Sequence, residues 1–195
     1  RLLEELDLVR KQREIQRSGR KRNLWPLASI VGYTNAGKST LLNSLTGAEV
    51  VAEDKLFATL DPTTRRLRLP TNQNVLISDT VGFIRKLPHR LVEAFKATLE
   101  EVVEADLLIH VTDLSHPQVD EQIKAVDTVL KEIKAHEKPC MMVFNKIDQV
   151  ESAGIIEHYL ETHRPAVAIS AKSQQGFDSF LAELGTQLRP IRQFL

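Results

Sequence analysis

Eight residues near the start of the chain have the types and the spacing that hold a phosphate chain. Residues 32–39 read GYTNAGKS and fit the pattern G-x-x-x-x-G-K-[ST] at every fixed position. The backbone N–H groups of such a loop can bind phosphate oxygens, while Lys38 reaches the β- and γ-phosphates and Ser39 ligates Mg²⁺. The predicted nucleotide-binding residues are Gly32, Tyr33, Thr34, Asn35, Ala36, Gly37, Lys38, Ser39 and Thr40.

A second motif, Asp79-Thr80-Val81-Gly82, follows the apolar run 75–78. An acid at the carboxyl end of a strand can hold a Mg²⁺ ion, and the Gly82 amide can approach a γ-phosphate. A lone D-x-x-G is a weak signal, but its position directly after a strand adds to it. We therefore predict nucleotide contacts from these four residues.

Two later motifs indicate which base is bound. Asn145-Lys146-Ile147-Asp148 follows the run 140–144, and the Asp148 carboxylate can accept two hydrogen bonds from the N1–H and N2–H₂ groups of guanine but not from adenine. Ser170-Ala171-Lys172 follows the next run, so the Ala171 amide could donate to guanine O6. The aliphatic stems of Lys146 and Lys172 could cover the ring faces. The expected ligand is therefore GTP or GDP, with base contacts from Asn145, Lys146, Asp148, Ser170, Ala171 and Lys172.

Alternating apolar runs and amphipathic stretches predict the elements that position these motifs. Strands are expected at 27–31, 65–69, 75–78, 106–112, 140–144 and 166–169, and helices at 39–45, 89–103, 118–135, 155–160 and 177–188. The strand at 65–69 reads as an edge strand in a hairpin with 75–78. The expected fold is α/β, a six-stranded, mostly parallel sheet with helices on both faces, which brings the four motifs to one edge. The polar stretch 48–64 is expected to be a long functional loop.

Length and composition limit the remaining choices. The chain has 195 residues, 26 basic and 26 acidic side chains and a formal net charge of zero, so attraction of the whole molecule to nucleic acid or membrane cannot be argued. The single cysteine, Cys140, cannot form an internal disulfide and is expected to be a small buried hydrophobe. No apolar run approaches the roughly eighteen residues that span a bilayer. A soluble, cytoplasmic monomer is expected.

The first 22 residues differ in composition from the rest. Apolar residues at helical spacing are followed by a run rich in arginine and lysine, so we expect a helical, basic linker at 1–22 from a missing upstream domain and a nucleotide-binding domain at 23–195. The basic run could be a solvated helix face or a contact to a phosphate backbone.

Together these motifs look like the signature motifs of translation-factor-class P-loop GTPases. More narrowly, the stretches 31–40, 56–65 and 79–84 resemble the bacterial HflX family of ribosome-associated GTPases, and the resemblance covers essentially the whole chain. It implies GTP hydrolysis, binding to the large ribosomal subunit through its rRNA, and splitting or rescue of stalled ribosomes. The family also has a separate amino-terminal domain, of which this sequence holds at most the final helix.

Hydrolysis is expected to be slow, because the position after Gly82 is occupied by Phe83, whereas many GTPases have a water-orienting glutamine there. Phe83 could instead pack beneath a mobile segment. The missing group could come from a partner, from another loop (Arg65, Arg66, Arg85 or His89) or from a cation. In similar GTPases an asparagine at the position of Asn35 helps to coordinate K⁺ beside the phosphates.

The resemblance also implies a threonine in the long loop that senses Mg²⁺ and the γ-phosphate. We expect this residue to be Thr59, with Thr63 and Thr64 as the next candidates, within a first switch at 48–64 and a second from Asp79 to about Pro88. The expected metal ligands are thus Ser39, Thr59 and Asp79, and the expected catalytic residues are Lys38, Thr59, Gly82 and Asn35.

Two other functions remain open at this point. The chain could be a guanine-nucleotide sensor or scaffold that does not hydrolyse GTP, which Phe83 would suit. It could also be a tRNA-modifying or ribosome-assembly GTPase of a sister family, since such proteins share most of the motifs, although the stretch 56–65 argues against it.

Overall fold

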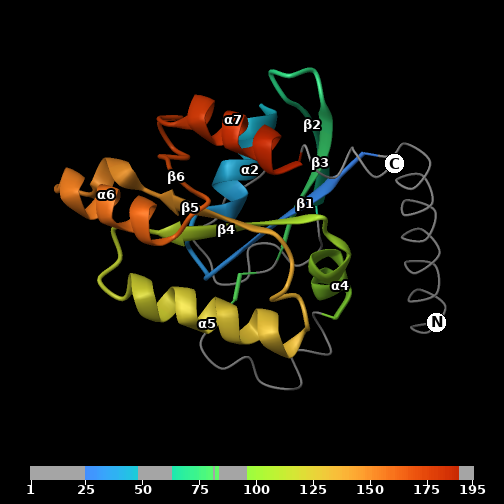
Figure 1. The fold of residues 1–195 in the computed structure, drawn as a ribbon, viewed down its shortest axis with the longest axis horizontal. Coiled ribbons are helices and arrows are strands. Elements are labelled where there is room, and N and C mark those ends of the chain that lie inside the picture. Colours follow the sequence, from blue (N-terminus) through green and yellow to red (C-terminus); the bar gives the residue numbers. More distant parts are fainter. Residues whose placement is uncertain (1–24, 48–62, 81, 84–95, 189–195) are drawn as a thin grey trace, which may run out of the picture.

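One twisted six-stranded sheet organises the molecule (Figure 1). The structure is a computed structural model that describes residues 25–47, 63–80, 82–83 and 96–188. In sheet order the strands are β2 (Thr63–Arg68), β3 (Asn74–Asp79), β1 (Leu27–Gly32), β4 (Leu107–Asp113), β5 (Cys140–Asn145) and β6 (Ala166–Ala168). All neighbouring pairs are parallel except β2 and β3. The expected α/β fold is confirmed.

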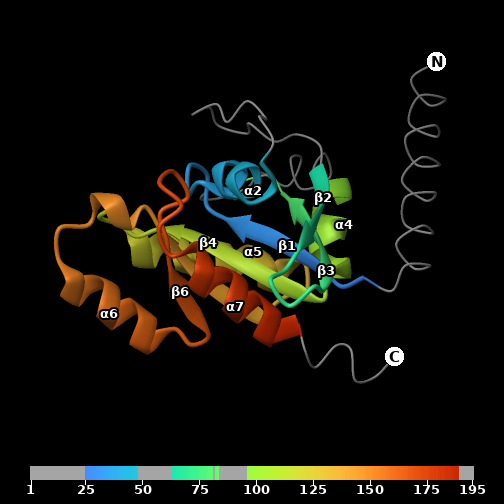
Figure 2. The same cartoon turned by 90° about the horizontal axis from the view of Figure 1, so that it is seen from above.

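Helices cover both faces of this sheet. Figure 1 shows α2 (Lys38–Thr46) and α7 (Phe177–Leu188) above the sheet and α5 (Val119–Glu132) below it, while α4 (Lys96–Glu104) packs beside β1. Figure 2, seen from above, shows α6 (Ala153–Thr162) at the end of the sheet formed by β5 and β6. Within the described residues, no helix is long and apolar enough to cross a membrane.

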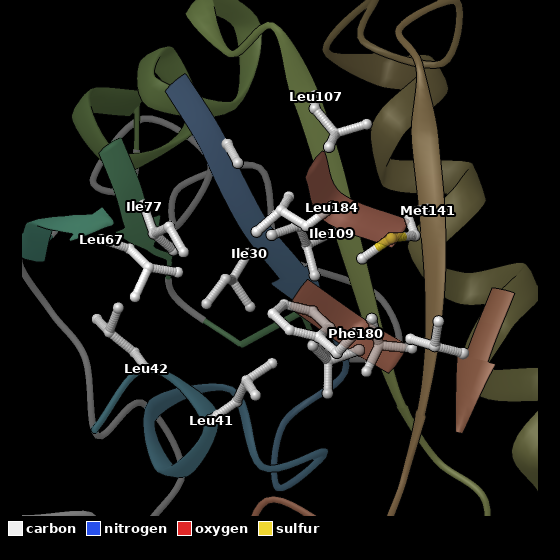
Figure 3. Packing of buried hydrophobic residues seen from close by; sticks show 14 of the residues in the cluster. Ile30, Leu41, Leu42, Leu67, Ile77, Leu107, Ile109, Met141, Phe180 and Leu184 are labelled. Atoms are coloured by element: carbon white, nitrogen blue, oxygen red, sulfur yellow. The ribbon is translucent and has the colours of Figure 1, made fainter. Parts of the chain in front are cut away.

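The central strands are apolar on both faces because helices bury both. Residues at alternate positions of β1 and β4, such as Ile30 and Ile109, point to the α2 and α7 side, where they meet Leu41 and Phe180 (Figure 3). Their neighbours Val31 and Leu108 belong to a second cluster with residues of α4 and α5. Burial of both faces is the pattern expected of parallel strands in a doubly wound sheet.

The strand order places β1 between β3 and β4. The connection from β1 runs through α2 towards β2 and β3, whereas β3 leads through α4 to β4 on the other side. Ligands of open α/β sheets bind in the crevice outside the carboxyl ends of the strands at such a switch point. Gly32, Asp79 and Asn145 are the last residues of three of these strands.

Several elements differ from their expected bounds: α5 ends at Glu132 rather than at 135, α6 extends two residues further at each end, and the difference nearest the site lies at β2. This strand begins at Thr63, two residues earlier than expected, because Thr63 and Thr64 pair with Asp79 and Ser78 of β3. Thr63 and Thr64, expected to be the last two residues of the loop at 48–64, therefore belong to β2 instead. The basic linker at 1–22, residues 48–62 and the part of the expected 89–103 helix before Lys96 lie outside the described residues.

Candidate nucleotide site

The turn from β1 into α2 has the backbone shape that the GYTNAGKS spacing predicts. Gly37 lies in the left-handed region, with φ of 93°, directly before the first residue of α2, and Asn35 has φ of 62°. A Cβ at position 37 would collide with Nδ2 of Asn145, so glycine is required there. The first amides of α2 have no acceptor within the helix and lie at its positive end, where an anion binds well.

The Lys38 side chain is folded into this loop. It is 6% exposed, and its Nζ donates to the Tyr33 carbonyl oxygen at 2.9 Å. Burial lowers the Lys38 pKa to about 8, and the negative charge of Asp79 opposes the shift only in part. Asp79 thus compensates only part of the cost of burying this ammonium group, and a phosphate would supply further negative charge.

Ser39, the second residue of α2, meets Asp79, the last residue of β3. The Ser39 Oγ donates to Oδ2 of Asp79 at 2.6 Å, although the two residues are 40 positions apart. Asp79 is 2% exposed, at the end of β3, and the neighbouring Thr80 Oγ1 donates to the Ile30 carbonyl oxygen at 2.6 Å. A hydroxyl and a carboxylate oxygen at this spacing form a donor set that fits Mg²⁺.

Gly82 and Phe83 are joined to the phosphate loop by the backbone. The Phe83 N–H donates to the Gly32 carbonyl at 3.0 Å, and the Thr34 N–H donates to the Phe83 carbonyl at 2.9 Å. The Phe83 side chain is fully buried in the cluster that contains Val31 and Val102. Its ring is therefore part of this core cluster and is not available to an attacking water.

The base side of the site is held together by Asn145, which is 2% exposed. Its Nδ2 donates to the Ala36 carbonyl at 2.8 Å, and its Oδ1 accepts from the Ala171 N–H at 2.9 Å. The Ser44 hydroxyl, from α2, donates to the Ala171 carbonyl at 2.8 Å. One amide side chain and one hydroxyl therefore fix the 170–172 loop against the phosphate loop.

This arrangement changes one expectation. The Ala171 N–H, expected to donate to guanine O6, already donates to Asn145, so a base could use it only by sharing or replacing that hydrogen bond. Asp148 is exposed on a short 3₁₀ turn, η1 (Ile147–Gln149), and Lys172 is also exposed. The Lys146 Nζ contacts Oδ2 of Asp113 at 2.7 Å.

Several predicted residues are not brought to the site by the described part of the chain. Thr59, Val81, Arg85 and His89 lie outside it. Arg65 donates to Thr46 Oγ1 at 3.0 Å, and the Arg66 guanidinium lies 5.5 Å from the ring centroid of Trp25. Thr63 and Thr64 lie in β2 rather than in a loop.

Sequence reasoning missed Ser44 and Asp113. Neither belongs to a motif, and both act through contacts to residues far away in the chain. The one available signal was the position of Asp113 at the end of an apolar strand, which is where Asp79 and Asn145 also lie.

Comparisons with known proteins agree with this geometry. Residues 28–146 match the family model described as "50S ribosome-binding GTPase". The chain is 52% identical over 191 residues to GTPase HflX of Lacrimispora saccharolytica, covering 98% of this chain and 45% of that protein. It is 56% identical over 146 residues to GTPase HflX of Escherichia coli K12, covering 75% of this chain and 34% of that protein.

A solved structure with a similar fold is a GTP-binding protein from the hyperthermophilic archaeon Sulfolobus solfataricus in complex with GDP. It is 27% identical, with a TM-score of 0.68, and the match covers 95% of this chain and 58% of that chain. The chain spans less than half the length of the curated relatives described above.

Proposed function

Because the chain belongs to the family of 50S ribosome-binding GTPases and matches GTPase HflX proteins over most of its length, we propose that it binds GTP and hydrolyses it to GDP and phosphate. The resemblance to the HflX family noted from the motifs is thereby confirmed. We also propose nucleotide-binding roles for individual residues and the large ribosomal subunit as the partner of this domain.

The observation that best supports nucleotide binding is the convergence of the motifs at one edge of the sheet. Gly37 is packed against Asn145, which in turn holds Ala171, and Ser39 contacts Asp79. Residues more than 100 positions apart in the chain are thus in direct contact, as Asn145 is with Ala36 at 2.8 Å.

Guanine selectivity is assigned to Asp148. Its carboxylate is exposed on η1, close in the chain to Asn145, and it could accept from N1–H and N2–H₂ of the base. Asp148→Asn should lower GTP affinity at least 100-fold, because a site built around a required hydrogen bond rejects a mismatched ligand strongly. The variant should gain affinity for xanthosine triphosphate, whose C2 oxygen would accept from the new amide. Wild-type GTP affinity with no xanthosine binding would refute the assignment.

Ser39 and Asp79 would hold Mg²⁺, together with Thr59 when the triphosphate is bound. The metal would neutralise charge on the β- and γ-phosphates, while Lys38 and the Gly82 amide stabilise the charge that develops on the transferring group. Phe83 is buried and cannot orient water, so intrinsic turnover should be slow. Asn35, exposed at the tip of the phosphate loop, would offer its amide oxygen to a K⁺ ion.

We place this activity in the cytoplasm, with a monomer acting on the large ribosomal subunit and splitting or rescuing stalled ribosomes. The family description supports the ribosomal partner. GTP turnover should be measured with and without purified large subunits, in K⁺ and in Na⁺ at equal ionic strength, for wild type and for Asn35→Ala. We expect stimulation by subunits and a K⁺ effect that Asn35→Ala abolishes. Equal rates in both salts would exclude the role of K⁺, and no stimulation by subunits would count against the ribosomal partner.

A further inference from the structure

Asp113 lies beside the base-reading loop but belongs to none of the motifs. It is the last residue of β4 and pairs in register with Asn145, the last residue of β5. The Leu114 N–H donates to the Asn145 carbonyl at 3.0 Å, which holds the two strand ends together. Asp113 is thus placed at the carboxyl end of the sheet, one strand away from the phosphate loop.

Both oxygens of the Asp113 carboxylate are used. Oδ1 accepts from the backbone N–H of Ser115 at 3.0 Å and from its hydroxyl at 2.6 Å. Oδ2 contacts the Lys146 Nζ at 2.7 Å. Because Ser115 fixes the carboxylate, the carboxylate can in turn fix the end of the Lys146 side chain.

Lys146 needs such an anchor for two reasons. Its backbone is in the left-handed region, with φ of 63°, which a residue with a Cβ adopts only when its surroundings hold it there. Its stem of four methylenes also has many rotamers, and ordering it on binding would reduce affinity. The side chains of Asp113 and Lys146 are only 12% and 29% exposed, so solvent screens this pair less than a surface pair.

We propose that Asp113 is a positioning residue for the guanine base: it holds the Lys146 stem extended in advance, so that the stem forms one wall of the base slot. The inference rests on the proposed binding of guanine nucleotides. It assigns Asp113 no contact with the nucleotide itself. Because the stem would meet the face of the ring, the effect should not depend on the phosphates or on the substituent at C2 of the base.

The test is a double-mutant cycle on nucleotide release, measured with fluorescent GDP, GTP and IDP. Asp113→Asn should raise the Kd of all three ligands by the same factor, about tenfold, mainly through faster release. Lys146→Met, which keeps an apolar stem but loses the ammonium group, should have a similar effect. The double variant should be no weaker than either single variant, because both remove the same contact.

Asp120→Asn is the matched control, because Asp120 is an exposed carboxylate that accepts from the Tyr159 hydroxyl and does not belong to the Asp113 network. It should leave release unchanged. Additive effects of Asp113→Asn and Lys146→Met would overturn the proposal, as would an effect on GTP but not on GDP. If Asp113→Asn did not fold, the cycle could be run with Asp113→Glu, for which the same additivity would overturn it.

The outcomes also separate this proposal from the proposed function. If Asp148→Asn converts the base preference while Asp113→Asn leaves release unchanged, guanine binding stands and the positioning role fails. If neither variant alters binding of guanine nucleotides, the assignment of base selectivity to Asp148 and the positioning role of Asp113 both fail. If the wild-type protein itself binds neither GDP nor GTP, the proposed function fails.

Discussion

The Lys38 side chain is buried, and burial disfavours the charged form of its ammonium group. The folded chain lowers its pKa from 10.5 to about 8, first through desolvation and only partly offset by Asp79. Between these values the unfolded chain binds more protons than the folded one, so the stability of the nucleotide-free domain should rise as pH increases from about 8 to 10.5. Nucleotide binding has the opposite dependence, because phosphates favour the protonated lysine.

We therefore predict that GDP affinity decreases as pH rises above 8, by up to about tenfold per pH unit, while Lys38 must take up a proton on binding. The affinity should be measured by calorimetry between pH 7 and 9. Lys38→Arg is the matched comparison, because arginine keeps its charge throughout this range. An identical pH profile in the two proteins would show that Lys38 is not the group responsible.

For single residues, the sequence predicts which motif positions come to the site but not which other side chains they contact there. The placement of Gly37, Lys38, Ser39 and Asp79 at one edge of the sheet could be predicted, because each has a fixed place in a short motif next to a strand. Ser44 could not be, since a serine within a helix has no signal until Ala171 is placed opposite it. The donation of the Ala171 N–H to Asn145 was missed for a similar reason: each residue lies in a motif, but neither motif shows that the two meet once β5 and β6 are paired.

The phosphate loop and the segment after β3 behave as one element. Their backbone hydrogen bonds extend the pairing of β1 and β3 past the ends of both strands, through Gly32, Thr34 and Phe83. Gly82 makes this approach possible, because a Cβ there would lie 2.8 Å from Thr34 Cγ2 and 3.0 Å from the Lys38 Nζ. Any movement of Phe83 would therefore be coupled to Gly32 and Thr34 of the predicted phosphate loop.

Gly82→Ala should force these two segments apart. We expect GTP affinity to fall by about tenfold or more and GDP affinity to fall less, since Gly82 is assigned to the γ-phosphate. Equilibrium binding of both nucleotides measures the ratio. Gly154→Ala, near the start of α6, is the control, because its new Cβ would come no closer than 3.7 Å to the nearest atom. Equal losses for GTP and GDP would argue against this role.

The elements themselves follow from hydrophobic patterning with small errors at their ends. α7 has the expected bounds, Phe177–Leu188, because its apolar spacing is regular and both neighbouring segments interrupt it. β2 starts earlier than expected because Thr63 and Thr64 have no apolar alternation of their own. Their strand conformation is imposed by pairing with Ser78 and Asp79, which is a tertiary effect that no local pattern contains.

Across the whole molecule, the sheet buries polar groups as well as apolar ones. His110, in the middle of β4, is 1% exposed, and its Nε2 has no hydrogen-bond partner in the described part of the chain. Burial lowers the His110 pKa to about 4, and the charges of Lys38 and His163 add to the shift. The imidazole ring is therefore neutral at physiological pH, and protonating it would destabilise the folded chain.

Because His110 is buried in its neutral form, we predict that the free energy of unfolding decreases at acid pH. As pH falls from about 6.5 to 4, the unfolded chain protonates His110 while the folded chain does not, so stability decreases over that range by about 3 kcal/mol from this group. His110→Leu should remove that contribution, and urea unfolding at pH 7 and at pH 4.5 should show a smaller difference in free energy than wild type. His136→Gln, at an exposed histidine, should leave the difference unchanged. If the His110→Leu protein lost as much stability as wild type over this range, the acid sensitivity would have to come from other groups.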